Sequence, residues 1–210
     1  MLDSKCKICR RLGAKLFLKG EKCFSPKCPM VRKSYPPGIK KKRRRRGALS
    51  EYGKELREKQ KLKNWYNLRE NQFKKYVREI LKKRGRVENP GQALVKILES
   101  RLDNVIFRLG FAASHSQARQ MVSHGHFFVN GRKVTIPSYE VKKGHKISIH
   151  PRSRQKAIFK NLPLVIKKHT PPSWISLNKE KLEGEVLGSP SLEEVSEPVE
   201  ISAIFEFYSR

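Results

Sequence analysis

The sequence predicts an α+β protein, because helix-type patterning early in the chain gives way to strand-type patterning later. From Leu49 to Gly125, apolar residues recur every three or four positions, as on the buried face of a helix. From His126 they alternate instead, around the strong hairpin signal Asn130-Gly131. Helices followed by an antiparallel sheet are typical of α+β architecture.

Residues 1–48, which precede the helical pattern, are predicted to form an extended arm. They contain all four cysteines and 17 Lys and Arg against Asp3 and Glu21. Proline, glycine and the run KKKRRRR at 40–46 oppose regular packing in this zone. We therefore expect an arm that is held near its start by whatever chemistry the cysteines perform.

Five segments between residues 49 and 125 carry the helical pattern. Capping residues precede three of them, and a glycine ends two of them. In chain order, these start and stop signals are Ser50, Gly85, Asn89 with Pro90, Gly110, and Ser114. The segments are short, and each has one apolar face, which predicts helices that pack against a shared core.

Two hairpins are predicted after the helices. HFFVNGRKVTI, 126–136, places two short strands around its turn, and YEVKKGHKISIH, 139–150, indicates another strand, turn and strand. Residues 161–177 are basic and interrupted by proline, whereas 178–210 carry eight Glu. The closing EISAIFEFYSR is apolar enough that we expect it to dock on the rest of the protein.

The charge of the chain indicates a polyanionic partner. The 210 residues include 48 Lys and Arg against 19 acidic residues, a formal net charge of +29. Such a chain repels itself when compact unless a polyanion neutralises it, and nucleic acid is the usual polyanion. A membrane surface is the alternative, but a run of about 18 apolar residues that could span one is absent. The start MLDSKCKICRR lacks the apolar region of a signal peptide, so we expect a reducing compartment.

The four cysteines have the spacing of a metal site. Cys6 and Cys9 form C-x2-C, and Cys23 and Cys28 form C-x4-C after thirteen residues. Four thiolates around Zn²⁺ are the commonest arrangement of this kind, and they leave no open position, which indicates a structural ion. An iron–sulfur cluster, and free or disulfide-bonded thiols, remain alternatives. Nearby bases can offset the negative charge of a metal–thiolate centre: Lys5, Lys7, Arg10, Arg11, Lys22 and Lys27.

The segment RLDNVIFRLGFAASHSQARQMVSHGHFFVNGRKV, 101–134, resembles a known RNA-binding module. The module occurs in S4-type ribosomal proteins, pseudouridine synthases, tyrosyl-tRNA synthetases and some stress proteins. Other stretches resemble the bacterial-type S4 family of small-subunit ribosomal proteins, in the family's own order. These are the cysteine spacing, SPKC, SYPPG, LSEYGKELREKQKLK, ENQFKKYV and the terminal EFYSR.

This resemblance covers nearly the whole chain and implies a division into parts. A zinc site and basic arm would occupy 1–48, and a helical rRNA-binding domain 49–97 would be completed by 178–210. The RNA-binding module, two short helices with a small antiparallel sheet, would occupy 98–160, and 161–177 would connect it onward. The apolar C-terminal segment would then return to the helical domain.

The resemblance also implies a function. Family members are structural constituents of the small ribosomal subunit that bind its 16S-type rRNA and help to nucleate assembly of the subunit body. They contribute to translational accuracy, contact neighbouring ribosomal proteins, and lie near mRNA where it enters the subunit. Some repress translation of their own mRNA. We therefore expect a protein of cytoplasmic ribosomes, with an organellar ribosome as the other possibility, and neither a membrane nor a small-molecule substrate as partner.

Candidate RNA-binding residues follow from the basic runs and from the module. An ordinary solvated face is the alternative for the helical bases, and a nuclear localisation signal or membrane patch for 40–46. His115 stands where the family usually has Arg, which would make that phosphate contact dependent on pH. The candidates are Arg10, Arg11, Lys22, Arg32, Lys33, Lys40, Lys41, Lys42, Arg43, Arg44, Arg45, Arg46, Lys54, Arg57, Lys61, Lys63, Arg69, His115, Gln117, Arg119, Gln120, His124, Asn130 and Arg132.

An enzyme carrying the module would need catalytic residues that this sequence does not offer. Aspartate occurs at Asp3 and Asp103, and we expect Asp103 and Asn104 to organise local hydrogen bonds. The nucleophile elbow GxSxG, the P-loop and the metalloprotease motif HExxH are absent. We therefore expect a binding protein, and the alternative to a ribosomal constituent is a free zinc-bearing regulator that binds RNA.

Overall fold

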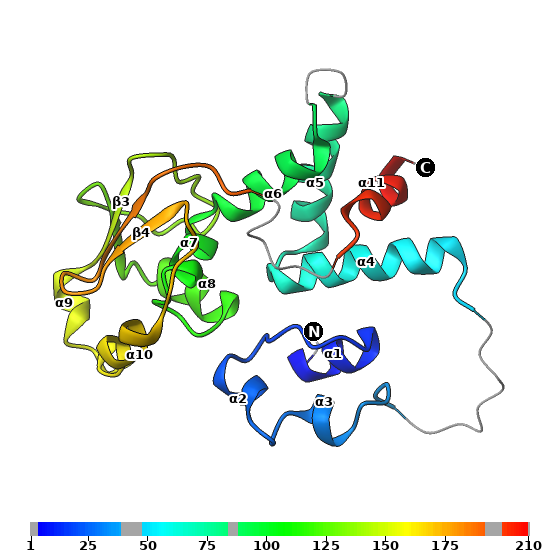
Figure 1. Cartoon of the computed structure of the whole chain (residues 1–210), viewed down its shortest axis with the longest axis horizontal. Helices are drawn as coiled ribbons and strands as arrows, with labels where there is room; N and C mark the ends of the chain where they lie inside the picture. The colour runs from blue at the N-terminus through cyan, green and yellow to red at the C-terminus, as the bar shows by residue number, and fades with distance from the viewer. Residues whose placement is uncertain (1–3, 39–47, 84–87, 192–198, 210) are drawn as a thin grey trace. The chain divides into compact units, whose positions relative to one another are not determined.

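The computed structural model describes residues 4–38, 48–83, 88–191 and 199–209. The chain divides into two compact units (Figure 1): the first unit is Met1–Gly91 with Glu197–Arg210, and the second is Gln92–Ser196. The basic run predicted to contact RNA, Lys40, Lys41, Lys42, Arg43, Arg44, Arg45 and Arg46, lies outside the described residues.

The start of the first unit is helical, where the sequence predicts an extended arm. It forms α1 (Lys5–Leu12), α2 (Glu21–Phe24) and α3 (Pro29–Arg32). Gly13 ends α1 in the left-handed conformation, φ 65°, which glycine adopts without steric cost and which turns the chain back. Cys9, Leu16 and Leu18 then form a small buried cluster, which is the main apolar packing of this stretch.

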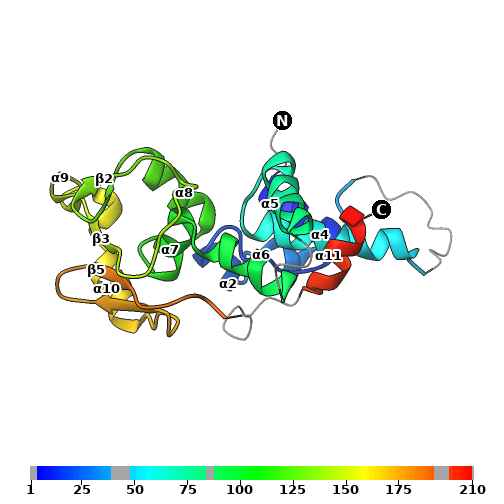
Figure 2. The same cartoon turned by 90° about the horizontal axis from the view of Figure 1, so that it is seen from above.

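Three longer helices form the rest of the first unit: α4 (Glu51–Trp65), α5 (Glu70–Lys82) and α11 (Ile201–Ser209). The predicted cap at Ser50 is confirmed, since its Oγ accepts a hydrogen bond of 3.2 Å from the Gly53 N–H. α11 lies beside α4 in both views (Figures 1 and 2) and also contacts α5. The apolar C-terminal segment therefore docks on helices that come more than a hundred residues earlier.

The second unit contains most of α6, then α7, α8 and a five-stranded antiparallel sheet, and α7 and α8 share one core with the sheet. The strand order is β2-β1-β3-β5-β4. Asn130 and Gly131 both have positive φ, 49° and 77°, as a two-residue hairpin turn requires, so the predicted β1–β2 hairpin is confirmed. The bounds are α6 (Pro90–Glu99), α7 (Leu102–Arg108), α8 (His115–Ser123), β1 (Phe127–Val129), β2 (Arg132–Lys133), β3 (Lys146–Ile149), β4 (Ile175–Asn178) and β5 (Glu183–Val186).

The second predicted hairpin forms only in part. β3 is its second strand, but residues 139–142 make an isolated bridge between Glu140 and Arg101 in place of the first strand. The Leu102 N–H donates to the Tyr139 carbonyl at 2.9 Å, and the Val141 N–H donates to the Ser100 carbonyl at 2.7 Å. The backbone groups of this stretch thus pair with the start of α7 and not with β3.

The sheet also extends further along the chain than the sequence predicts. The predicted module ends at residue 160, and 178–210 are assigned to the helical domain, whereas β4 and β5 belong to the second unit. Gly184 permits this arrangement, because a Cβ there would lie 2.4 Å from Cδ2 of Leu109. The predicted connector, 161–177, contains α10 (Leu162–Lys168) and the first residues of β4, whereas α9 (Pro151–Arg154) and η1 (Ala157–Phe159) precede it.

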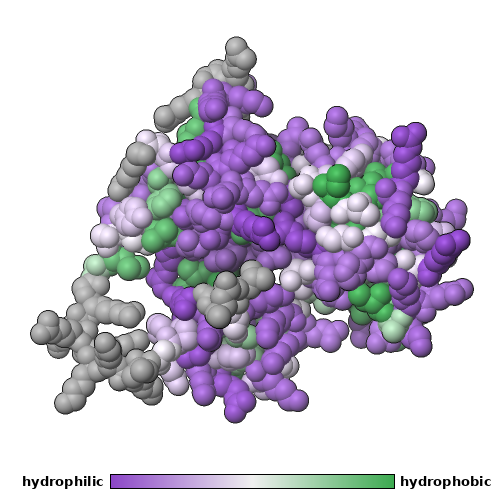
Figure 3. All heavy atoms as spheres, turned by 180° about the vertical axis from the view of Figure 1, so that it is seen from behind, coloured by the Kyte–Doolittle hydropathy of each residue, from purple (hydrophilic) through white to green (hydrophobic). Residues whose placement is uncertain are grey.

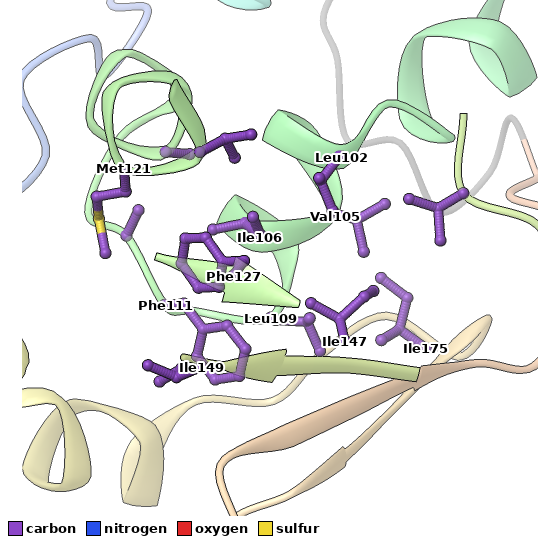
Figure 4. Packing of buried hydrophobic residues seen from close by; sticks show 14 of the residues in the cluster. Leu102, Val105, Ile106, Leu109, Phe111, Met121, Phe127, Ile147, Ile149 and Ile175 are labelled. Atoms are coloured by element: carbon purple, nitrogen blue, oxygen red, sulfur yellow. The ribbon is translucent and has the colours of Figure 1, made fainter. Parts of the chain in front are cut away.

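The core of the second unit lies between α7 and the sheet (Figure 4). Leu102, Ile106 and Leu109 point from the α7 segment toward Phe127 and Ile147 of the strands, and all five are fully buried. Burying a large aliphatic or aromatic side chain contributes about 1.5–3 kcal/mol, so this cluster is sufficient to hold α7 on the sheet.

The surface is much more polar than the core. The face in Figure 3 is covered mainly by hydrophilic side chains, with apolar patches scattered among them. Among the helices of the described ranges, none has the length and apolarity needed to cross a bilayer.

Candidate nucleic-acid interface

The four cysteines come together around one small cavity in the first unit. Cys6 and Cys9 lie one turn apart on α1, Cys23 lies in α2, and Cys28 directly precedes α3. None of these four cysteines is paired in a disulfide, and Cys6 is the one that is partly exposed. The four residues that the spacing groups together thus line one cavity, and their role as ligands of one ion stays a prediction.

The donor set fits a thiolate-binding ion by its chemistry. Four sulfur donors line the same cavity, with Lys5, Lys15 and Lys19 beside them. Burial raises the pKa of the Cys9 thiol, a backbone hydrogen bond at Leu16 lowers it, and the neighbouring cysteines raise it further. However, within the described ranges no three Cys, His, Asp or Glu side chains stand in an arrangement that would hold a metal ion. Zinc therefore stays a prediction.

The lysines of this cavity differ in part from those expected. Lys5 was predicted from its position beside Cys6, but Lys15 and Lys19 were missed. They reach the cavity because the chain reverses after Gly13, which brings residues 15–19 back past the cysteines. Proximity in sequence could not show this reversal, although a glycine after a short helix is a signal for it.

The predicted RNA-binding bases of the first unit fall into two sets by exposure. Several of the partly buried ones make contacts within the protein. The Lys63 Nζ lies 2.9 Å from Oε2 of Glu70, and the Arg57 Nε donates to the Leu12 carbonyl at 3.1 Å, which joins α4 to the end of α1. The exposed set is Arg11, Lys22, Arg32, Lys33, Lys54 and Arg69, and the partly buried set is Arg10, Arg57, Lys61 and Lys63.

A carboxylate that the sequence did not single out connects three helices of this unit. Glu70 of α5 accepts from the Lys59 Nζ at 2.7 Å and from the Tyr208 hydroxyl at 2.8 Å, besides its bond with Lys63. Burial would raise the pKa of Glu70, but the hydrogen bonds from Lys59, Lys63 and Tyr208 lower it to about 2. The buried Lys59 also lies 4.3 Å from the centre of the Phe207 ring on α11.

In the second unit, a buried polar network organises the helices of the module. Asn104 donates to Glu99, and Arg108 binds the same Glu99 carboxylate through two bonds of 2.7 and 3.0 Å. Asp103 accepts from Arg101 through two bonds and from the Arg119 Nε at 3.2 Å. The expectation that Asp103 and Asn104 organise local hydrogen bonds is confirmed.

His115 lies inside this network. Its side chain is buried, its Nε2 lies 2.8 Å from Oδ1 of Asn104, and its ring centre lies 4.0 Å from that of Phe107. Burial, together with the positive charges of Arg108, Arg119 and Arg101, lowers the pKa of His115 to about 3. The side chain is therefore neutral near pH 7, and the expected phosphate contact with pH dependence near its ordinary pKa does not follow from this geometry.

The other predicted residues of the module divide between structure and surface. The Gln117 side chain accepts from the Ala113 N–H at 2.9 Å, and the Asn130 side chain accepts from the Lys146 N–H at 2.8 Å. Three further residues, Gln120, His124 and Arg132, are exposed around the end of α8 and the hairpin. Asn130 is exposed as well, although its side chain is engaged with Lys146.

Replacing Glu99 by Ala is expected to destabilise the second unit by about 3 kcal/mol. The Glu99 side chain has no exposed surface, and its loss leaves Arg108 and Asn104 without that carboxylate. Removing one partner of a buried pair costs about 3–5 kcal/mol, and we expect the lower end because the Arg108 side chain is 18% exposed. Native-state hydrogen exchange of the α7 amides measures the effect.

The matched control is Glu140→Ala, an exposed glutamate of the same unit. Its loss should change the free energy of unfolding by no more than about 0.5 kcal/mol. Equal effects of the two substitutions on α7 exchange would show that the Glu99 network does not stabilise the unit.

Comparison with known proteins identifies the family. Residues 1–99 match the family described as "Ribosomal protein S4/S9 N-terminal domain", and residues 100–147 match the "S4 domain". A protein of Halothermothrix orenii named small ribosomal subunit protein uS4 is 49% identical over 205 residues, which cover 98% of this chain and 96% of that protein. The chain belongs to the uS4 family.

Other uS4 proteins are similar over the same extent. That of a Thermoanaerobacter species is 46% identical over 205 residues, and that of Syntrophomonas wolfei is 46% identical over 208 residues, which cover 99% of this chain and 98% of that protein. The resemblance to the S4 family that the sequence motifs indicated is thereby confirmed. These uS4 relatives are named as ribosomal proteins and not as enzymes, in agreement with the expected class of protein.

Proposed function

We propose that this protein is a structural constituent of the small ribosomal subunit and binds the rRNA of that subunit directly. One observation carries the proposal: the similarity to proteins named small ribosomal subunit protein uS4 extends through both units of the chain. The net charge of +29 supports it, because a polyanion is needed to neutralise such a surface. The same proposal places the protein on cytoplasmic ribosomes.

The rRNA-binding surface, in this proposal, uses exposed basic and polar side chains of both units. In the first unit these are the residues that face solvent on α1 to α5, and in the second unit they are Gln120, His124 and Arg132. Lysine and arginine contact phosphates, which gives affinity, whereas unpaired bases are recognised by stacking and hydrogen bonds. The run 40–46 is part of the proposal on the strength of its sequence, and His115 is left out because it is buried.

The proposal includes a structural Zn²⁺ held by Cys6, Cys9, Cys23 and Cys28. The ion would join α1 to the segments around α2 and α3, and its closed ligand shell would perform no reaction. Its support is the convergence of four thiols on one cavity in a part of the protein with few buried apolar residues. An iron–sulfur cluster is the competing occupant of a four-cysteine site.

Finer roles are proposed from the family resemblance. They are nucleation of assembly of the subunit body, a contribution to translational accuracy, contacts with neighbouring ribosomal proteins, and a position near the incoming mRNA. A free zinc-bearing regulator is the other function that the sequence leaves open, and the names of the similar proteins give it no support.

Sedimentation of cell lysate through a sucrose gradient tests the proposal. The protein is expected to migrate with small subunits in amounts comparable to other subunit proteins, and to bind purified small-subunit rRNA. A protein that stays at the top of the gradient and leaves naked rRNA unbound would refute a ribosomal role and favour the free regulator.

A further inference from the structure

Two phenylalanines of the first unit face solvent although their neighbours are buried. Phe17 is 40% exposed, and Phe24 is 74% exposed, which leaves most of its ring open to water. The two rings stack on each other, with their centres 4.9 Å apart and their planes inclined by 27°. They therefore form one apolar surface, and we call this pair the aromatic platform.

The local structure holds both rings at the surface. Phe17 lies between the buried Leu16 and Leu18, and it adopts a positive φ of 51°, which is unfavourable for a bulky side chain. Phe24 follows the buried Cys23 at the end of α2. Because both neighbours of Phe17 are anchored in the cluster of α1, its ring has to point outward, and a strained residue of this kind is typical of functional positions.

The surroundings of the aromatic platform are strongly basic. The Lys15 Nζ lies 5.1 Å from the centre of the Phe17 ring. Residues 4–38 contain ten Lys and Arg in total, whereas Glu21 is the one acidic residue in this range. An occupant of this surface must accordingly offer a flat apolar face together with negative charge, which is the chemistry of a nucleotide.

We propose that Phe17 and Phe24 stack against an unpaired nucleobase of rRNA while Lys15 contacts a phosphate next to it. This inference rests on the proposed function and adds to it a class of contact, since paired bases are not accessible to stacking by a side chain. Any of the four bases has a face that can stack, so the aromatic platform selects unpaired over paired nucleotides more than one base over another. The lysines and arginines around the aromatic platform favour RNA over a protein as the partner.

Binding of the full-length protein to purified small-subunit rRNA tests the inference. Stacking of a base on an aromatic ring is worth about 1–3 kcal/mol, so Phe24→Leu is expected to weaken binding about tenfold. The dependence of affinity on salt should be unchanged, because leucine removes no phosphate contact. Phe24→Tyr should restore wild-type affinity, since tyrosine presents a similar ring. Phe24 is so exposed that neither substitution should disturb folding.

A direct readout of stacking comes from fluorescence. The added indole of Phe24→Trp is expected to be quenched when rRNA binds, beyond the change that wild-type protein shows. The matched control is Leu164→Trp, because Leu164 is 67% exposed and belongs to the second unit, not to the aromatic platform. Equal quenching of the two variants would overturn the inference.

The outcomes separate this inference from the proposed function. If wild-type protein fails to bind rRNA, the proposed function is overturned, and the aromatic platform with it. If wild-type protein binds and Phe24→Leu binds equally well, the aromatic platform alone is overturned. The stacking inference is also overturned if Phe24→Leu binds rRNA normally but no longer enters small subunits. That result would show that the aromatic platform contacts a protein partner.

Discussion

If Zn²⁺ occupies the cysteine site, as we propose, its removal is expected to unfold residues 4–38 while the second unit stays folded. The buried apolar cluster of this stretch consists of Cys9, Leu16 and Leu18, which is too little to hold three short helices. A structural zinc site contributes apparent binding energy of about 10–16 kcal/mol to local folding, and its loss should therefore be decisive. The second unit has its own core and should be indifferent to a chelator. Hydrogen exchange resolved along the chain distinguishes the two responses.

Elemental analysis of the purified protein comes first and should find one zinc per chain. Cys9→Ser should lose the metal and unfold the same stretch without a chelator, because Cys9 is buried among the other thiols. Ser25→Ala is the matched control, since Ser25 lies between Cys23 and Cys28 without being a thiol. If residues 4–38 are folded without a stoichiometric metal, the structural zinc site is refuted. If the protein contains iron and absorbs visible light, an iron–sulfur cluster and not zinc occupies the site.

The affinity for small-subunit rRNA is expected to fall roughly 10³–10⁵-fold between about 50 and 200 mM salt. Such a loss corresponds to about six to ten phosphate contacts, each of which releases condensed counterions. The exposed lysines and arginines of the two units are numerous enough to supply these contacts. Binding measured across a salt series gives the slope directly, and an affinity that is insensitive to salt would contradict a surface dominated by phosphate contacts.

Single substitutions locate the contacts on the surface. Neutralising an exposed basic residue of the first unit, by Arg32→Gln or Lys33→Gln, should remove one phosphate contact. The slope of log affinity against log salt concentration should then fall by about one. Lys143→Gln is the matched control, because Lys143 is also exposed but belongs to the turn before β3, which we do not place at the interface. If all three variants show the wild-type slope, Arg32 and Lys33 make no phosphate contact.

Local signals in the sequence predicted much of the fold. Ser50, Ser114 and Gly110 mark helix ends, and Asn130-Gly131 marks a hairpin, because each acts through the backbone of its own neighbours. β4 and β5 were missed since their pairing depends on β3, which lies far away in the sequence. The extended arm was wrongly expected over residues 5–32, where turns at Gly13 and Gly20 make short helices possible.

The candidate site shows the same division. The spacing within each cysteine pair indicates that the two thiols lie close together, and in the structure all four line one cavity. The burial of His115 could not be predicted, since it depends on Asn104 and Phe107 from another helix. The aromatic platform was also missed, because exposure of Phe17 and Phe24 is a property of the folded chain and not of its composition.

The position of α11 has a consequence for the order in which the nascent chain can fold. Synthesis proceeds from the N-terminus, and domains generally fold as they emerge. Lys59 is buried against Phe207, and Glu70 receives a hydrogen bond from Tyr208, so α4 and α5 lack part of their packing until the last residues are translated. The second unit, although it comes later in the chain than α4 and α5, can therefore be complete before the first.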